Sequence, residues 1–137
     1  MLKLLCDRLA EASAEKLHEE IRKVYWGYSK EENITKKELF QSKYRGIRPA
    51  FGYPSLKDPK QMEKLFKLLN GTEVTSVTLT ESYMMNPVSS VCGLYFGAPK
   101  SRYFDLLKLS KDQIEDYSRR TGEKIEVVEK RLNNYLL

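Results

Sequence analysis

The chain is short of the residue types from which most catalytic and metal sites are built. Its 137 residues include two cysteines, Cys6 and Cys92, and one histidine, His18. A closed zinc site needs four nitrogen or sulfur ligands, so these three residues cannot supply one. Cys6 falls on an apolar helical face and Cys92 in a strand-like run, which favours small core residues over a catalytic thiol. We therefore expect neither a metal site nor a catalytic residue.

Long apolar runs and glycine-rich phosphate loops are also missing. No apolar stretch approaches the roughly 20 residues that a membrane-spanning helix needs. The opening Met1 to Leu5 is interrupted too soon by Asp7 and Arg8 to be a secretion signal. The seven glycines form neither a G-x-G-x-x-G nor a Walker motif, which argues against a Rossmann-type nucleotide site. We expect a cytoplasmic protein that does not enter membranes.

Positive charge is present, and it is concentrated in one part of the chain. The net charge is +5, from 24 basic and 19 acidic residues. Residues 36–70 hold nine of the basic residues and only three of the acidic ones. The net charge of this basic window is therefore +6, and the rest of the chain sums to −1.

The most unusual segment, from Arg45 to Pro54, lies inside this basic window. It combines two arginines, two prolines and two glycines with the aromatic residues Phe51 and Tyr53. Proline fixes φ and disfavours helix at the residue before it, whereas glycine allows the backbone to approach a ligand closely. Composition alone leaves two interpretations open, a rigid anion-binding loop and an ordinary surface connection.

Apolar spacing and capping signals predict helices at both ends of the chain. The longest, from Leu2 to about Tyr25, is amphipathic and ends at Trp26-Gly27-Tyr28. The other helices that we expect run from a capping box at Thr35 to about Tyr44, from Asp58-Pro59 to Asn70-Gly71, from a capping box at Ser110 to Arg120 with a stop at Gly122, and from about Ile125 to Leu132.

Three segments have the character of strands. Val74–Thr80 is rich in β-branched residues, and Val91–Phe96 and Tyr103–Leu109 are further candidates. The short connections between them favour antiparallel pairing. We therefore predict one α+β domain over residues 1–137, with a mainly antiparallel sheet flanked by helices, a long N-terminal helix and two C-terminal helices.

The first predicted helix carries a polar stripe. Glu11, Glu15 and His18 are spaced at i, i+4 and i+7, so they share one side of the helix. The stripe fits either a seam that faces a ligand or a solvated side. For Glu15 and His18 we favour the solvated side.

The segment Arg48–Pro54 resembles the R-x-x-x-G-Y signature of the C-terminal activation domain of cobalamin-dependent methionine synthase. The resemblance runs from about Asp7 to Leu132 and corresponds to the C-terminal part of a longer family domain. Further blocks that look like the family occur in its order: Asp7–Ala12, Leu17–Glu19, Trp26–Tyr28, Leu79–Ser82, Gly93–Phe96, Ser101–Phe104 and Asp112–Tyr117.

This resemblance implies a module that binds S-adenosylmethionine and serves the reductive reactivation of cobalamin, in methionine biosynthesis. By position, Arg48 would bind the ligand's carboxylate, the Ala50 backbone would contact the ligand, and Tyr103-Phe104 would contact its adenosyl part. Three further residues complete the implied cofactor-binding set: Gly52, where the chain would pass close to the ligand, Tyr53, which would face the sulfonium or the cobalamin, and Glu11, at an acidic position of the first helix.

The chain would act as part or accessory of the methyltransferase and not as a catalyst by itself. It lacks the D-x-H-x-x-G signature of a cobalamin domain, so cobalamin would be held by a partner domain. A flavodoxin or flavodoxin-like reductase would supply the electron, and the basic window suits an acidic flavodoxin. Two acidic groups of the family are missing, because its upstream aspartate has no counterpart and Ser42 stands where a glutamate is frequent.

Two alternatives to this function remain open. One is a partner-binding module of the same fold that no longer binds S-adenosylmethionine. The other is a basic nucleic-acid-binding domain, for which pI ≈ 9.1 and interleaved aromatics are the only support. We rank the reactivation module first, and we do not expect nucleic acid to be the partner.

Overall fold

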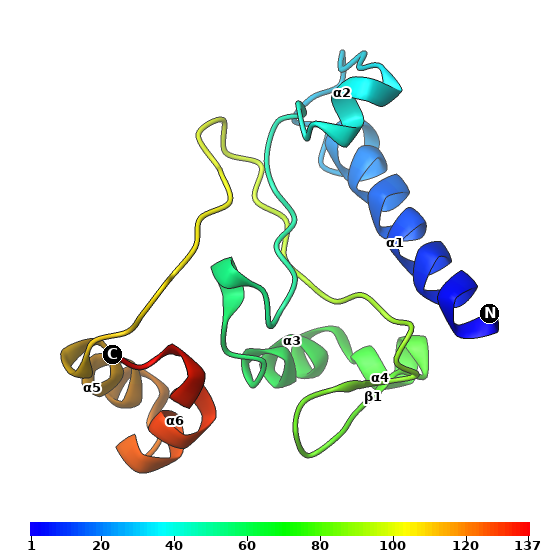
Figure 1. Cartoon of the computed structure of the whole chain (residues 1–137). Coiled ribbons are helices and arrows are strands. Elements are labelled where there is room, and N and C mark those ends of the chain that lie inside the picture. The colour runs from blue at the N-terminus through cyan, green and yellow to red at the C-terminus, as the bar shows by residue number, and fades with distance from the viewer.

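Helices dominate the computed structural model, which describes residues 1–137 (Figure 1). The long helix α1 (Leu2–Glu20) lies on one side, and α5 (Lys111–Thr121) and α6 (Ile125–Leu132) form a pair on the opposite side. The shorter helices α2 (Lys36–Phe40), α3 (Gln61–Leu69) and α4 (Gly71–Thr75) lie between them in sequence. Long segments without regular secondary structure cross the middle of the molecule.

The predicted N-terminal helix is confirmed, with one irregularity near its end. After Glu20 the chain continues as a π-helix, Ile21–Tyr25, whose wider turn is closed by the Trp26 N–H donating to the Ile21 carbonyl at 3.0 Å. Gly27, with φ +68°, then leaves the helical conformation. His18 and Arg22, one helical turn apart, are both fully buried.

Local capping signals give the correct starts of α2 and α5 and the correct ends of α3 and α5, whereas α2 ends at Phe40, short of the predicted Tyr44. At α2 the Glu38 N–H donates to Thr35 Oγ1 at 3.3 Å, and the Thr35 N–H donates to the Glu38 carboxylate at 2.9 Å. The second capping box, at Ser110, begins α5. Asn70 and Gly122, both left-handed, end α3 and α5. Each signal acts within a few residues, so the sequence is sufficient to predict it.

The sheet is antiparallel, as predicted, but much smaller. Strand β1 (Thr78–Leu79) pairs with β2 (Met85–Asn86), with Thr78 opposite Asn86. The predicted strand Val74–Thr80 is wrong in its first half, because Gly71–Thr75 forms α4. There the Thr75 hydroxyl donates to the Gly71 carbonyl at 2.7 Å and stabilises a helical turn. The result is a helix-rich α+β fold.

The other two strand candidates are wrong as regular strands. Val91–Phe96 makes two isolated antiparallel bridges, Ala50 with Gly93 and Ile47 with Phe96. Tyr103–Leu109 makes a single parallel bridge, Leu109 with Leu136. Both segments follow the pairing tendency of their residues without completing a ladder. The first pair of bridges is nevertheless important, since it sets the 45–54 loop beside residues 93–96.

The buried core is small and lies in the C-terminal helix pair. Only 11 of the 137 residues are buried. Ile114 of α5 packs against Val128 and Leu132 of α6, with Leu109 and Tyr117 beside them. None of the helices is both long and apolar enough to cross a membrane.

A network of charged groups joins the segment before α3 to this helix pair. The Arg131 Nε donates to Asp58 at 2.9 Å, and Arg131 Nη2 donates to Glu123 at 2.7 Å. The Tyr117 hydroxyl also donates to Asp58 at 2.7 Å. Since Asp58 and Arg131 are almost entirely buried, this network fixes the end of the loop region against α5 and α6.

Candidate functional site

The 45–54 loop is held firmly against residues 92–97. The Leu94 N–H donates to the Pro49 carbonyl at 3.0 Å, and the Ile47 and Phe96 backbones exchange two hydrogen bonds of 3.0 Å. A Cβ at Gly93 would lie only 2.5 Å from the Pro49 carbonyl oxygen, so the close approach of the two segments requires glycine there. The 45–54 segment is therefore held firmly in place, as a rigid loop requires, and its role as an anion site stays a prediction.

Tyr103 and Phe104, about fifty residues downstream, are tied to the same loop. The Arg48 N–H donates to the Tyr103 hydroxyl at 3.0 Å. The Ser55 hydroxyl donates to the Phe104 carbonyl at 3.0 Å. Burial raises the pKa of Tyr103, so its hydroxyl stays protonated at neutral pH. These bonds bring together two segments that the sequence analysis connects only through the family resemblance.

A cavity of about 520 Å³ opens between the two segments. Its volume falls within the range of roughly 300 to 1,000 Å³ that is usual for small-molecule sites. Arg48 supplies its cation, and Tyr53 and Phe104 supply half-exposed aromatic faces. Six of the seven predicted site residues line it: Glu11, Arg48, Ala50, Tyr53, Tyr103 and Phe104.

Gly52, the seventh, does not line this cavity. Its φ of +87° explains why glycine is needed. A Cβ at Gly52 would meet no atom within 4 Å. The expected close approach of the backbone to the ligand at Gly52 stays a prediction.

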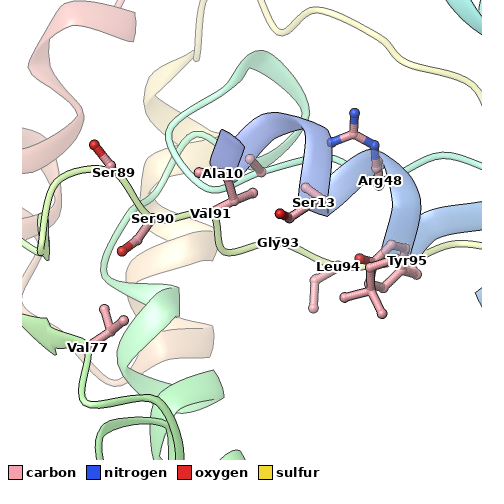
Figure 2. A pocket seen from close by; sticks show the side chains of 13 residues that line it. Ala10, Ser13, Arg48, Val77, Ser89, Ser90, Val91, Gly93, Leu94 and Tyr95 are labelled. Atoms are coloured by element: carbon pink, nitrogen blue, oxygen red, sulfur yellow. The ribbon is translucent and has the colours of Figure 1, made fainter. Parts of the chain in front are cut away.

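A second cavity of about 360 Å³ adjoins the first at Arg48. Figure 2 shows Ala10 and Ser13 of α1 facing the segment from Ser89 to Tyr95, with the Arg48 side chain at one end. Both cavities include Arg48, Ala50 and Val91. Arg48 therefore lies where α1, the loop and the 89–95 segment meet.

The Arg48 guanidinium forms an ion pair with Glu15 of α1. Arg48 Nη2 donates to Glu15 Oε2 at 2.8 Å, and the side chains are 21% and 28% exposed. Burial lowers the pKa of Arg48, but the hydrogen bond and charge of Glu15 outweigh it and leave that pKa raised. Arg48 Nε and Glu15 Oε1 are buried without a partner. The guanidinium is thus charged and keeps donors that a ligand can use.

The sequence profile of the vitamin B12 dependent methionine synthase activation domain matches residues 1–122. The chain belongs to this family.

Among solved structures, the MetH reactivation domain bound to AdoHcy superposes with a TM-score of 0.96 at 46% sequence identity. That match covers 99% of this chain and 42% of the other chain. The present activation-domain chain therefore spans less than half the length of the protein that it matches. At this identity and overlap, the two share their fold over the whole of the present chain.

The activation-domain chain also contains a buried polar cluster that the sequence analysis missed. His18 lies edge-on to Tyr44, with ring centroids 5.0 Å apart, and its Nε2 is 3.4 Å from the Tyr28 hydroxyl. Arg22 makes a forked bond to Glu32, with N–O distances of 2.8 to 3.0 Å. The interpretation of Glu15 and His18 as a solvated side is wrong. Arg22, which continues the same helical stripe, was the signal that could have revealed it.

Burial determines the protonation of this cluster. His18 is fully buried, and burial together with the charges of Arg22 and Arg48 lowers its pKa from 6.5 to about 4. The imidazole is therefore neutral at pH 7. No group of three or more histidine, cysteine or carboxylate side chains is placed to hold a metal ion.

Proposed function

We propose that this chain binds S-adenosylmethionine in the cavity beside Arg48 and serves the reactivation of cobalamin in cobalamin-dependent methionine synthase. The observation that carries this proposal is the meeting of Arg48 with Tyr103 and Phe104 at one cavity. The AdoHcy in the similar reactivation domain supports it, because S-adenosylhomocysteine is what remains when S-adenosylmethionine gives up its methyl group. The alternative module without ligand is not favoured, since the cavity and its cation are retained.

The residues of this cavity suit the parts of S-adenosylmethionine. A guanidinium presents a planar fork of N–H donors, which binds a carboxylate in two places. The aromatic rings of Tyr53 and Phe104 offer faces for the sulfonium and the adenine. A cation–π contact with the sulfonium contributes about 0.5 to 2 kcal/mol, depending on desolvation. Glu11 lines the same cavity and supplies a carboxylate for the positively charged part of the ligand.

The chemistry divides between this chain and a partner that holds cobalamin. Cobalamin held by that partner would supply the methyl acceptor, using one electron from the reductase, and the methyl group would pass to it from the sulfur of the ligand as the methyl–sulfur bond breaks. The residues of this chain bind the ligand and orient its methyl group outward from the cavity. S-adenosylhomocysteine then remains at Arg48, with its carboxylate unchanged by the reaction.

The basic window offers a docking surface for an acidic reductase of the flavodoxin type. Five of its lysines are exposed and take part in no ion pair: Lys36, Lys37, Lys43, Lys64 and Lys67. Exposed cations of this kind steer the association of an oppositely charged partner and make its rate depend on salt. We propose both the flavodoxin-type reductase and the cobalamin-binding domain as partners of this chain.

Calorimetry with S-adenosylmethionine tests the proposal on the full-length protein. Arg48→Ala should weaken binding by about 30- to 150-fold, because it removes a charged, two-point hydrogen bond. Arg102→Ala is the matched control, since Arg102 is exposed and lines none of the cavities described above. It should leave the affinity unchanged. Absence of binding by the unsubstituted protein, or equal binding by Arg48→Ala, would contradict the proposal.

A further inference from the structure

We propose that Glu15 is a positioning residue, which holds the Arg48 guanidinium in the orientation that receives the ligand's carboxylate. This inference rests on the function proposed above and deepens it by assigning a role to a residue outside the ligand cavity. Glu15 lies 33 positions before Arg48 in sequence, and its Oε2 accepts a hydrogen bond of 2.8 Å from Arg48 Nη2.

The position of Glu15 relative to the cavity bears on whether Glu15 orients Arg48 or competes with the ligand's carboxylate for it. Arg48 lines the ligand cavity, whereas Glu15 does not. Glu15 instead lines a neighbouring pocket, between α1 and α2, which shares Glu11 and Arg48 with the ligand cavity and also includes Arg22 and Glu32. The Arg48 side chain therefore lies at the boundary of the two pockets, and Glu15 contacts it from the pocket that does not include Tyr103 and Phe104.

The bonding of the guanidinium leads to the same conclusion. Glu15 accepts one hydrogen bond from Arg48, and a guanidinium has five N–H donors. A glutamate that blocked the site would occupy two of the donors as a carboxylate ligand does. The remaining donors, including the unpartnered Nε, stay available.

The backbone on both sides of the ion pair is fixed. The Arg48 N–H is held by the Tyr103 hydroxyl at 3.0 Å. Glu15 lies in the middle of α1, three residues before the fully buried His18. Without Glu15, the long Arg48 side chain would stay mobile until the ligand binds. The entropy lost in ordering it would then oppose binding. Pre-ordering one such side chain should be worth about three- to tenfold in affinity.

The test compares two ligands that differ in the carboxylate alone. Binding of S-adenosylmethionine and of decarboxylated S-adenosylmethionine is measured by calorimetry on the full-length protein. Glu15→Ala should weaken S-adenosylmethionine binding about three- to tenfold and change binding of the decarboxylated ligand less than about twofold. Glu15→Gln should recover part of the loss, because its amide oxygen still accepts from Arg48. In the background of Arg48→Ala, Glu15→Ala should have no further effect.

Glu19→Gln is the matched control, because Glu19 lies one turn further along α1 and pairs with exposed Lys16. It should leave both affinities unchanged, and circular dichroism should show equal helix content in all variants. An equal loss for both ligands, an unchanged affinity, or tighter binding of S-adenosylmethionine by Glu15→Ala would overturn this inference alone. Absence of S-adenosylmethionine binding by the unsubstituted protein would overturn the proposed function and this inference together.

Discussion

The backbone and the side chain of Arg48 each contact a different part of the molecule. Its backbone N–H donates to Tyr103, its side chain pairs with Glu15, and the same side chain lines the cavity assigned to the ligand. Proline at position 49 restricts the backbone conformation of Arg48 as well. A residue held at so many points has little conformational freedom to lose, and such preorganisation favours tight binding.

The hydroxyl of Tyr103 gives a prediction at this scale. Tyr103→Phe keeps the aromatic ring but removes the acceptor of the Arg48 N–H, so binding of S-adenosylmethionine should weaken by about 0.5 to 1.5 kcal/mol in calorimetry. Tyr53→Phe is the control, because Tyr53 lines the same cavity and its hydroxyl forms no hydrogen bond within the chain. Equal effects of the two substitutions would show that the hydrogen bond from the Arg48 N–H to Tyr103 does not contribute to the affinity for S-adenosylmethionine.

His18 gives a second prediction, on pH. Its pKa is about 4 in the folded chain and 6.5 as the ordinary value, so the unfolded chain binds more protons between these two pH values. Stability must therefore fall as the pH falls through this window. Lowering the pH from 7 to 5 should decrease the free energy of unfolding by about 2 kcal/mol.

Urea unfolding followed by circular dichroism at pH 7 and pH 5 measures this change. His18→Phe keeps an aromatic ring in the buried site and cannot titrate, so most of the difference should disappear. The titration of Glu123 adds little to the stability difference between pH 7 and pH 5. Its pKa is lowered to about 2, chiefly by the hydrogen bond from Arg131, so the stability it contributes is lost only as the pH falls below about 4.5. An unchanged pH dependence in His18→Phe would contradict the assignment.

At the scale of the elements, the helices were predictable and the strands were not. The capping residues affect only their own or adjacent turns, so neighbouring residues are enough to predict their effects. They are Thr35, Asn70, Ser110 and Gly122. Pairing of Gly93 with Ala50 joins segments about forty residues apart, and strand propensity alone does not determine such partners. The β-branched side chain of Val74 favours a strand, and the local hydrogen bonds of α4 override that preference.

The candidate site was predictable to a similar, limited degree. Composition identified the 45–54 loop, and the family resemblance supplied Tyr103 and Phe104. The Glu15–Arg48 pair could not be deduced, because it joins a helix to a loop across the fold. The roles of the predicted site residues stay predictions until the binding experiments are made.

The pairing of α5 and α6 gives an element-scale prediction. Arg131→Ala would leave Asp58 buried without its cationic partner, so the free energy of unfolding should decrease by about 3 kcal/mol. The control is Arg120→Ala, whose ion pair with Asp116 is largely exposed, and it should change stability by less than about 0.5 kcal/mol. Chemical denaturation of both variants measures the difference. Similar losses would mean that the Asp58 network adds nothing to an ordinary surface pair.

At the scale of the whole molecule, the exposed surface is unusually large. The accessible area is 10177 Å² for 16.0 kDa, whereas a compact monomer of this mass exposes about 7,400 Å². The exposed residues include many large apolar side chains, among them Leu2, Leu5 and Leu9 of α1. The chain also spans 42% of the reactivation domain that it resembles. We therefore expect this apolar surface to be accessible on the 137-residue chain, and a single independent domain at residues 1–137 stays a prediction.

Dye binding tests this expectation. The 137-residue chain by itself should bind the apolar dye ANS more strongly than a compact protein of equal mass, because many of its large apolar side chains are exposed. Leu5→Lys and Leu9→Lys together should decrease the fluorescence. Fluorescence at the level of the compact protein would show that the chain covers its own apolar surface in solution.

The π-helix at Ile21–Tyr25 has a consequence for how this helix can evolve. A π-turn contains one residue more than an α-helical turn, and each residue of an α-helix advances the chain by about 100°. Deletion of one residue there would give a regular helix, but it would rotate Trp26-Gly27-Tyr28 away from His18 and remove the Tyr28 carbonyl from Arg45. Descendants that lose the extra residue therefore lose an anchor of the Arg45 to Pro54 loop as well, and we expect selection to retain this length of chain.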